Sequence, residues 1–173
     1  MSLMLTDASP DDAEELLALY APYILHTAIT YEYTVPTVDE FRGRIEKVQT
    51  AYPYLVVRED GHIVGYAYVS RFRERRAYDR SVETSIYVRA DCHGRGIGRM
   101  LYEELERRLP PLGVTNLYAC IAAPEETRGE DEYLTYDSVR FHTALGYRQV
   151  GRFSGCAFKF GRVYDMIFME KKL

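Results

Sequence analysis

Apolar residues recur at helical spacing in two segments of the N-terminal quarter. Ser9 suits a helix N-cap and Pro10 suits the first helical position. The apolar positions that follow share one helical face: Ala13, Leu16, Leu17, Tyr20 and Ile24. The letters TVDE at Thr37–Glu40 have the form of a capping box, and an apolar stripe follows them at Phe41, Ile45 and Val48. The pattern predicts two helices.

Strand patterns fill most of the remaining chain. Runs rich in β-branched and aromatic residues occupy residues 54–70, 82–88, 116–122, 147–153 and 163–171. The first run contains Asp60–Gly61, a pair that fits a tight hairpin turn. Helices are expected at residues 97–109 and at Ser138–Leu145, where Gly146 suits the C-terminal stop. This order of elements indicates a mixed α/β (α+β) fold with a single sheet.

The length, charge and cysteine content narrow the class of protein. With 173 residues and no repeat or linker, we expect one domain over residues 1–173, although Met1–Leu3 could be a remnant of cloning. The formal net charge of -4 argues against a nucleic-acid binder. We find no signal peptide and no apolar run near the roughly 20 residues that span a bilayer. Three cysteines without metal-type spacing favour the cytoplasm and no metal site.

Three glycines at alternate positions, Gly94, Gly96 and Gly98, separate the strand at residues 82–88 from the next helix. A helix start leaves N–H groups unpaired and carries partial positive charge, and glycines let a ligand approach the backbone. Together with Arg95 and Arg99, this turn would suit a phosphate or pyrophosphate. The spacing is neither that of a Walker loop nor that of a dinucleotide fingerprint. A glycine-rich turn without a ligand is the alternative.

The stretch VRADCHGRGIGRMLYEELE resembles the acyl-CoA pyrophosphate loop of the GNAT superfamily of N-acetyltransferases. Residues 52–88, 141–153 and 159–170 extend the resemblance nearly end to end, and they are most similar to the phosphinothricin and methionine sulfone/sulfoximine acetyltransferase branch. The resemblance implies a mostly antiparallel twisted sheet flanked by helices, with strands splayed at the acetyl-CoA site. It also implies the following contacts to acetyl-CoA, with His93 where the family pattern has Arg or Gln: Ile86, Tyr87, Val88, His93, Gly94, Arg95, Gly96, Ile97, Gly98, Arg99 and Thr135.

The resemblance also implies the catalytic groups. An amine must lose a proton before it attacks a thioester, and the branch carries its general base at the position of Glu83. A backbone N–H near Tyr87 or Val88 would stabilise the charge on the thioester oxygen. His142 stands where many relatives have a tyrosine, and imidazole can protonate a leaving thiolate near neutral pH. The alternatives are an exposed strand glutamate at position 83 and a helix-surface histidine at position 142.

An arginine-rich segment, residues 71–80, leads directly into the strand with Glu83. Arginine pairs with carboxylate or phosphinate in a two-pronged geometry. The branch binds its substrate with this segment, so Arg73, Arg75 and Tyr78 are the expected substrate contacts, with Tyr31 and Tyr33 as further candidates. The acidic segment Pro124–Thr135 could be a lid, but a solvated surface insertion is the commoner meaning of such a loop.

We therefore expect an N-acetyltransferase that moves acetyl from acetyl-CoA directly to the α-amine of a small amino-acid-like substrate, with no metal. A second reading is acetylation of another amine, such as an antibiotic, a polyamine or a protein N-terminus, although the arginines argue against polycations. A third reading is a non-catalytic acyl-CoA sensor, which would keep the glycine loop but need no base. The resemblance also implies a homodimer, while the cysteines, apolar runs and net charge above favour a cytoplasmic protein with no membrane or nucleic-acid partner.

Overall fold

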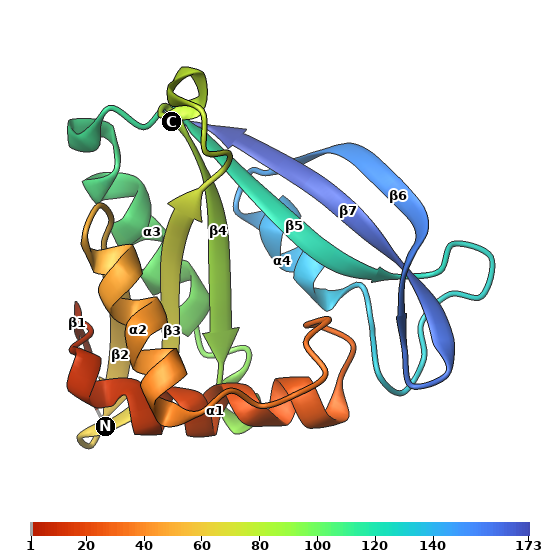
Figure 1. Ribbon diagram of the computed structural model, residues 1–173, viewed down its shortest axis with the longest axis horizontal. Helices are drawn as coiled ribbons and strands as arrows, with labels where there is room; N and C mark the ends of the chain where they lie inside the picture. Colours follow the sequence, from red (N-terminus) through yellow and green to blue (C-terminus); the bar gives the residue numbers. More distant parts are fainter. Residues whose placement is uncertain (1) are drawn as a thin grey trace.

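The computed structural model describes residues 2–173, and its central feature is one seven-stranded sheet (Figure 1). The strand order is β1-β2-β3-β4-β5-β7-β6. The strands are β1 (Leu3–Asp7), β2 (Tyr54–Glu59), β3 (His62–Arg71), β4 (Ser81–Val88), β5 (Asn116–Pro124), β6 (Arg148–Lys159) and β7 (Arg162–Lys172). Neighbouring strands are antiparallel except for β4 and β5, which are parallel. The predicted single, mostly antiparallel sheet is confirmed.

Helices cover both faces of the sheet. On one side, α1 (Ala13–His26) packs on β3 and β4, and α2 (Val38–Gln49) packs on β2 and β3. On the other side, α3 (Ile97–Arg108) packs on β2, β3 and β4. Helix α4 (Asp137–Ala144) lies against β5 on the side of α3 (Figure 1). Three clusters of buried side chains result among the described residues: one under α3, one under α1 and α2, and a small one around Ala28, Leu134 and Tyr164. Within residues 2–173, no helix is both long and apolar enough to cross a membrane.

Local sequence signals set the ends of the elements. The Thr37 hydroxyl accepts from the Glu40 N–H at 3.2 Å, and the Glu40 carboxylate accepts from the Thr37 N–H at 2.7 Å, so the predicted capping box forms. A second capping box at Ser9 opens a short 3-10 turn that leads into α1. Asp60 and Gly61 both have positive φ, 50° and 86°, as a tight hairpin turn between β2 and β3 requires.

Strand β1 is an addition to the predicted elements. Leu3, grouped above with Met1 and Ser2 as a candidate remnant of cloning, is the first residue of β1 and pairs with Glu59 of β2. Met1 lies outside the described residues. The strand has five residues, and Met4 at its second position is 54% exposed. Such a short edge segment gives too weak an alternation to be recognised from the sequence.

Strands β4 and β5 are joined over a short distance and then diverge. Their parallel pairing covers only Ser81–Glu83 of β4 and Asn116–Tyr118 of β5. Figure 1 shows the two strands meeting near the C-terminus and separating toward α1. The splay that the resemblance implied is therefore present, and it leaves one edge of β4 unpaired from Thr84 to Val88.

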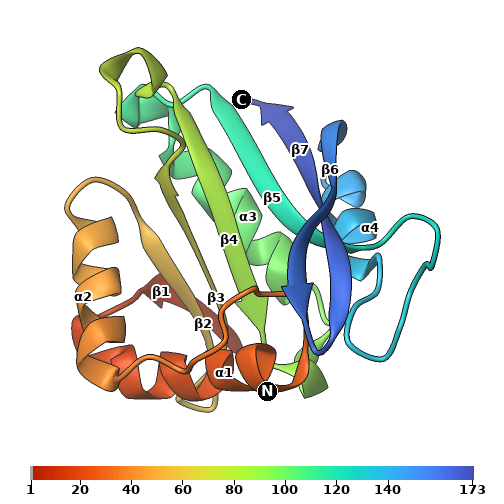
Figure 2. The same cartoon turned by 45° about the vertical axis from the view of Figure 1, so that its right-hand side comes forward.

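The segment that follows α1 bridges the open end of this gap (Figure 2). The Ala28 N–H donates to the Tyr133 carbonyl at 3.0 Å, and the Tyr31 hydroxyl donates to the Asp165 carbonyl at 2.5 Å. The buried Lys159 ammonium of β6 donates to the carbonyls of Thr27 and Thr30, each at 2.8 Å. Residues 27–31 are thus tied to the β5–β7 half of the sheet.

The acidic segment Pro124–Thr135 is only partly the solvated insertion that we expected. Residues 126–128 at its tip are exposed. Its second half packs inward, because Leu134 is buried and the Asp131 carboxylate accepts from the Tyr164 hydroxyl at 3.0 Å. Arg162 also pairs with Asp131 at 2.9 Å, so this half is anchored to β7.

Candidate active site

Two adjoining cavities lie in the gap between β4 and β5 and at the start of α3. The larger has a volume of about 480 Å³ and the smaller about 220 Å³. Both are lined by Ile29, Ile86 and Ser138, so the two spaces meet at these side chains. A long ligand in the larger cavity could therefore present its end to the smaller one.

The larger cavity surrounds the N-terminus of α3. Gly96 is the N-cap, its φ of 81° is left-handed, and no side chain caps this helix start. The Gly96 carbonyl accepts from Met100, so the N–H groups of residues 97–99 have no partner within the helix. These amides and the positive end of the helix dipole make an anion site. The predicted residues that line this cavity are Ile86, Val88, His93, Gly94, Gly96, Ile97, Gly98 and Arg99.

Gly98 serves packing as well as access. A Cβ at this position would lie 2.8 Å from Cε2 of Phe141 and 3.3 Å from Cδ1 of Ile86. The absence of a side chain therefore lets α3 approach α4 and β4 closely. This role was not recognised from the sequence, because it depends on a residue more than 40 positions away.

Three of the predicted acetyl-CoA contacts lie outside the larger cavity. Tyr87 lines the smaller cavity instead. The Arg95 guanidinium turns to Glu59 at the end of β2, with contacts of 3.0 and 2.5 Å, and it holds the pKa of that carboxyl below its ordinary value. The Thr135 hydroxyl donates to the Asp137 carboxylate at 2.9 Å and lines neither cavity.

His93 takes part in a small polar cluster at the rim. Its Nε2 lies 2.9 Å from the Val88 carbonyl and 3.0 Å from the Tyr23 hydroxyl, which also donates to that carbonyl. The Val88 carbonyl on the free edge of β4 is therefore satisfied by side chains. Tyr23 lines the larger cavity but was not predicted as a site residue. Its position in α1 does not indicate a contact with Val88, which lies 65 positions away.

The register of β3 and β4 determines which amides face the gap. The Arg89 N–H donates to the Val64 carbonyl, so every second residue back along β4, including Tyr87, bonds to β3. The N–H groups of Ile86 and Val88 point the other way, where β5 has already diverged. Of the two N–H groups predicted from the sequence, that of Val88 is free to bind a ligand and that of Tyr87 is not. The N–H of Ile86, which was not predicted, is also free.

The smaller cavity brings together five of the predicted residues: Tyr31, Glu83, Ile86, Tyr87 and His142. Glu83 is half-buried at the point where β4 and β5 separate. Burial and, next, the neighbouring Glu83 carboxylate raise the pKa of the Cys120 thiol to about 12. Cys120 is therefore a neutral thiol beside Glu83 and a poor nucleophile.

His142 is buried, with 3% of its surface exposed, and is no helix-surface residue. Its Nδ1 lies 2.7 Å from the Ser138 carbonyl, and its Nε2 lies 2.9 Å from the Tyr102 hydroxyl of α3. Burial lowers the pKa of His142 to about 4. Tyr102 also lines the smaller cavity, and it was missed because its position on the buried face of α3 is typical of a core residue.

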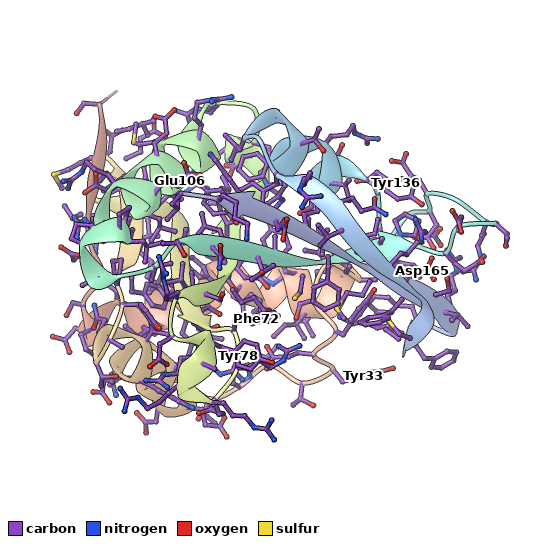
Figure 3. All side chains as sticks on the ribbon, turned by 90° about the horizontal axis from the view of Figure 1, so that it is seen from above. Tyr33, Phe72, Tyr78, Glu106, Tyr136 and Asp165 are labelled. Atoms are coloured by element: carbon purple, nitrogen blue, oxygen red, sulfur yellow. The ribbon has the colours of Figure 1, made fainter. Side chains whose placement is uncertain are left out.

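The other predicted substrate residues lie outside both cavities. Arg73, Arg75 and Tyr78 are exposed, and the Arg73 guanidinium stacks 4.2 Å above the Phe72 ring. Phe72, which was not predicted, stacks on Tyr118 of β5 at 4.4 Å and meets the Tyr78 ring edge-on at 6.0 Å (Figure 3). Tyr33 is 66% exposed and its hydroxyl donates to the Phe158 carbonyl.

Comparison with known proteins identifies the family. The domain model described as "Acetyltransferase (GNAT) domain" matches residues 5–168. The chain belongs to the GNAT acetyltransferase family. This confirms the resemblance seen in the sequence.

Two relatives of this GNAT chain have curated activities. It is 35% identical to the phosphinothricin N-acetyltransferase of Streptomyces coelicolor over 94% of this chain and 92% of that protein. It is 30% identical to the L-methionine sulfoximine/L-methionine sulfone acetyltransferase of Pseudomonas aeruginosa, over 100% and 96% of the two chains. A solved structure, the GNAT superfamily phosphinothricin acetyltransferase of Sinorhizobium meliloti in complex with AcCoA, matches with a TM-score of 0.88. Its sequence identity is 34%, over 100% of this chain and 89% of that one.

The larger cavity of this GNAT chain fits acetyl-CoA. The unpaired N–H groups at residues 97–99 suit a pyrophosphate, and the free edge of β4 offers N–H groups to an amide-containing arm. Among residues 2–173, no group of three or more His, Cys, Asp or Glu side chains is placed to hold a metal ion.

Proposed function

We propose that this chain transfers acetyl from acetyl-CoA to the α-amine of a small amino-acid-like substrate. The observation that carries the proposal is the position of Glu83. Its side chain lines the 220 Å³ cavity, which adjoins the anion site at the start of α3. This volume is below the roughly 300 Å³ at which drug-sized pockets begin, so it supports a small amine.

Glu83 is the proposed general base. An α-ammonium group has to lose a proton before its nitrogen can attack, and a carboxylate at the cavity wall can accept that proton. As the new C–N bond forms, the carbonyl oxygen gains negative charge. The free N–H of Ile86 or Val88 is the proposed donor to that oxygen.

Transfer is proposed to be direct, without an acyl-enzyme. The thiol that lines the smaller cavity, Cys120, has a raised pKa and an acidic neighbour, so it is mostly protonated near neutral pH. Cys92 is buried beneath the glycine turn and lines the larger cavity instead. Neither thiol is activated by a histidine.

Substrate selection is proposed to lie with the segment around Phe72. Curated relatives act on phosphinothricin or on methionine sulfoximine and sulfone, by their names. Arg73 lies beside Phe72, which stacks on Tyr118 of β5 next to the cavity-lining Ala119 and Cys120. We propose that Arg73 and Arg75 attract the polar or anionic end of such a substrate. Tyr78 and Tyr33 are proposed to flank the substrate, and Tyr31 is proposed to contact it from the cavity wall.

The test is release of free thiol from acetyl-CoA with a panel of amines. The panel contains methionine sulfone, methionine sulfoximine, phosphinothricin, spermidine and a short peptide. We expect turnover on the first three, and we expect Glu83→Gln to lower kcat/KM by about 100-fold or more. Glu46→Gln, an exposed glutamate of α2, is the matched control and should leave turnover unchanged.

Other outcomes of this assay refute parts of the proposal. Turnover only on spermidine or the peptide would keep the acetyltransferase and discard the substrate class. No turnover on any amine, with acetyl-CoA still bound, would favour the non-catalytic sensor. Full activity in Glu83→Gln would remove the general-base assignment.

We also propose a homodimer in the cytoplasm. Strand β6 is an edge strand, and it exposes Val150, Phe153 and Phe158 by 43%, 54% and 59%. Exposed apolar side chains on a sheet edge favour association with a partner. Light scattering after size-exclusion chromatography should give twice the chain mass, and Phe153→Lys should lower it. The three unpaired cysteines support a reducing compartment.

A further inference from the structure

A chain of polar side chains forms one end of the smaller cavity. It contains Thr84 of β4, Tyr102 of α3 and His142 of α4, and it ends at the backbone of Ser138. Tyr102 and His142 have 2% and 3% of their surfaces exposed. Ser138 lines both cavities, so this polar chain lies next to the place where they meet.

The direction of each hydrogen bond follows from the groups at its ends. The Ser138 carbonyl can only accept, so His142 Nδ1 carries a hydrogen and donates to it at 2.7 Å. Burial lowers the pKa of His142, so the ring is neutral near pH 7 and Nε2 has a free electron pair. The Thr84 hydroxyl donates to the Tyr118 carbonyl at 3.3 Å, so its oxygen accepts from Tyr102. The single Tyr102 O–H therefore has two acceptors, His142 Nε2 at 2.9 Å and the Thr84 oxygen at 3.1 Å.

This arrangement leaves His142 without a proton to offer the cavity. Its single N–H is bonded to the carbonyl one turn back along its own helix. Tyr102, in contrast, lines the cavity, and its O–H can turn about the C–O bond toward a better acceptor. Burial raises the pKa of Tyr102, so the group stays protonated and remains a donor.

We propose that the Tyr102 hydroxyl donates a hydrogen bond to the sulfur that leaves when the thioester is cleaved, and that His142 is a positioning residue for Tyr102. This inference rests on the proposed acetyl transfer. The C–N bond forms as the amine proton passes to Glu83. The C–S bond then breaks, and its electron pair stays on sulfur. The sulfur leaves as a thiolate that is stabilised by the Tyr102 O–H.

The proton balance follows from the acidities of the two groups. A thiol has an ordinary pKa of about 8.5 and a phenol of about 10, and burial raises that of Tyr102 further. The proton therefore stays on Tyr102. The departing thiolate takes a proton from solvent, and Glu83 returns the amine proton to solvent.

The test measures the thiol of bound coenzyme A, with no amine and no turnover. The ultraviolet absorbance of the thiolate is followed against pH in the coenzyme A complex, and the desulfo-coenzyme A complex of the same variant supplies the blank. We expect Tyr102→Phe to raise the pKa of the bound thiol by about one unit, the size of one hydrogen bond to a charged group. An unchanged thiol pKa in Tyr102→Phe would overturn the proposal.

Tyr147→Phe is the matched control. Tyr147 packs against His142 with ring centroids 5.1 Å apart, and its buried hydroxyl has no partner among residues 2–173. It does not line the smaller cavity. We expect this variant to leave the thiol pKa unchanged, and an equal shift in Tyr147→Phe would mean that the effect is general packing and would refute the assignment.

The positioning role of His142 has its own readout. Glutamine keeps a carbonyl oxygen that can accept from Tyr102, whereas leucine does not. We expect kcat to fall about tenfold in Tyr102→Phe and His142→Leu, with much of it retained in His142→Gln and the KM for acetyl-CoA unchanged in all three. If His142→Gln loses as much as His142→Leu, His142 does not act through Tyr102. If Tyr102→Phe shifts the pKa of the bound thiol but the protein acetylates no amine, the hydrogen bond to sulfur is supported and the proposed function is refuted.

Discussion

Gly65 of β3 is the point where α3 rests directly on the sheet. A Cβ built at Gly65 would lie 2.8 Å from Cγ2 of Ile97, 3.3 Å from Cγ2 of Val88 and 3.5 Å from Cδ1 of Leu101. Ile97 is the first residue of α3, and its N–H is one of the unpaired amides of the larger cavity. The substitution Gly65→Ala should therefore disturb both the core and the anion site.

Two opposing effects set the size of the change. Replacing a strand glycine by alanine normally stabilises a protein by roughly 0.5–1 kcal/mol. An added methyl in a close-packed core costs about 1–3 kcal/mol, and the β-branched Ile97 has few rotamers with which to move its methyl away. We expect a net loss of about 1 kcal/mol in the free energy of unfolding. The displaced amides of α3 should weaken acetyl-CoA binding about fivefold, which also corresponds to about 1 kcal/mol.

Urea unfolding and calorimetric titration with acetyl-CoA measure the two effects. Gly43→Ala in α2 is the control, because nothing lies within 4 Å of its built Cβ, and it should gain up to about 1 kcal/mol. In a double-mutant cycle with Ile97→Ala, the clash disappears, so we expect a coupling energy of about 1 kcal/mol. A Gly65→Ala variant that is stabilised like Gly43→Ala, with unchanged acetyl-CoA affinity, would refute the close seating of α3.

Three further predictions follow from buried or exposed polar groups. The pKa of His142 is about 4 in the folded protein and about 6.5 in the unfolded chain. The neutral ring therefore contributes its full stabilisation above pH 6.5, and this is lost as the pH falls toward 4. We expect the free energy of unfolding, measured with urea, to fall by up to about 3 kcal/mol over this range, and we expect no such fall in His142→Gln. Asp165 is fully buried and pairs with Arg152 Nε at 2.7 Å, so Asp165→Asn should cost about 3 kcal/mol in the same assay, and a loss under about 1 kcal/mol would contradict this. Iodoacetamide at about pH 8 should modify the exposed Cys156 and spare Cys120, whose thiol pKa is raised to about 12. Peptide mass spectrometry measures the two labelling rates, and fast labelling of Cys120 would contradict the burial and acidic neighbour assigned to it.

The parts of the fold that could be predicted are those with a local cause. The capping box at Thr37 and the hairpin turn at Asp60–Gly61 depend on neighbours within three residues, and both form as expected. The anion site at the start of α3 is also local, because Gly96 caps the helix without a side chain. The resemblance to a known family added the splay between β4 and β5, which no local pattern indicates.

The parts that were missed depend on contacts between distant segments. Arg95 was predicted to bind a phosphate, but its guanidinium forms an ion pair with Glu59 at the end of β2. His142 gave no sign of burial, because the rings around it, those of Tyr102 and Tyr147, come from another helix and from the turn before β6. The first strand was lost because five edge residues carry too little pattern. In each case the deciding partner lies outside the window in which sequence periodicity is read.

The two sides of the gap between β4 and β5 are connected at both of its ends. The two halves of the sheet are joined at one end by the three paired residues of each strand. At the opposite side, Tyr23 attaches α1 to Val88 of β4, and the Lys159 ammonium attaches the segment after α1 to β6. Strand pairing thus connects the two halves at the closed end of the gap, and these hydrogen bonds connect them at the open end. We therefore expect a change at Lys159, which lines neither cavity, to alter the width of the gap at Ile86 while every cavity-lining side chain stays the same.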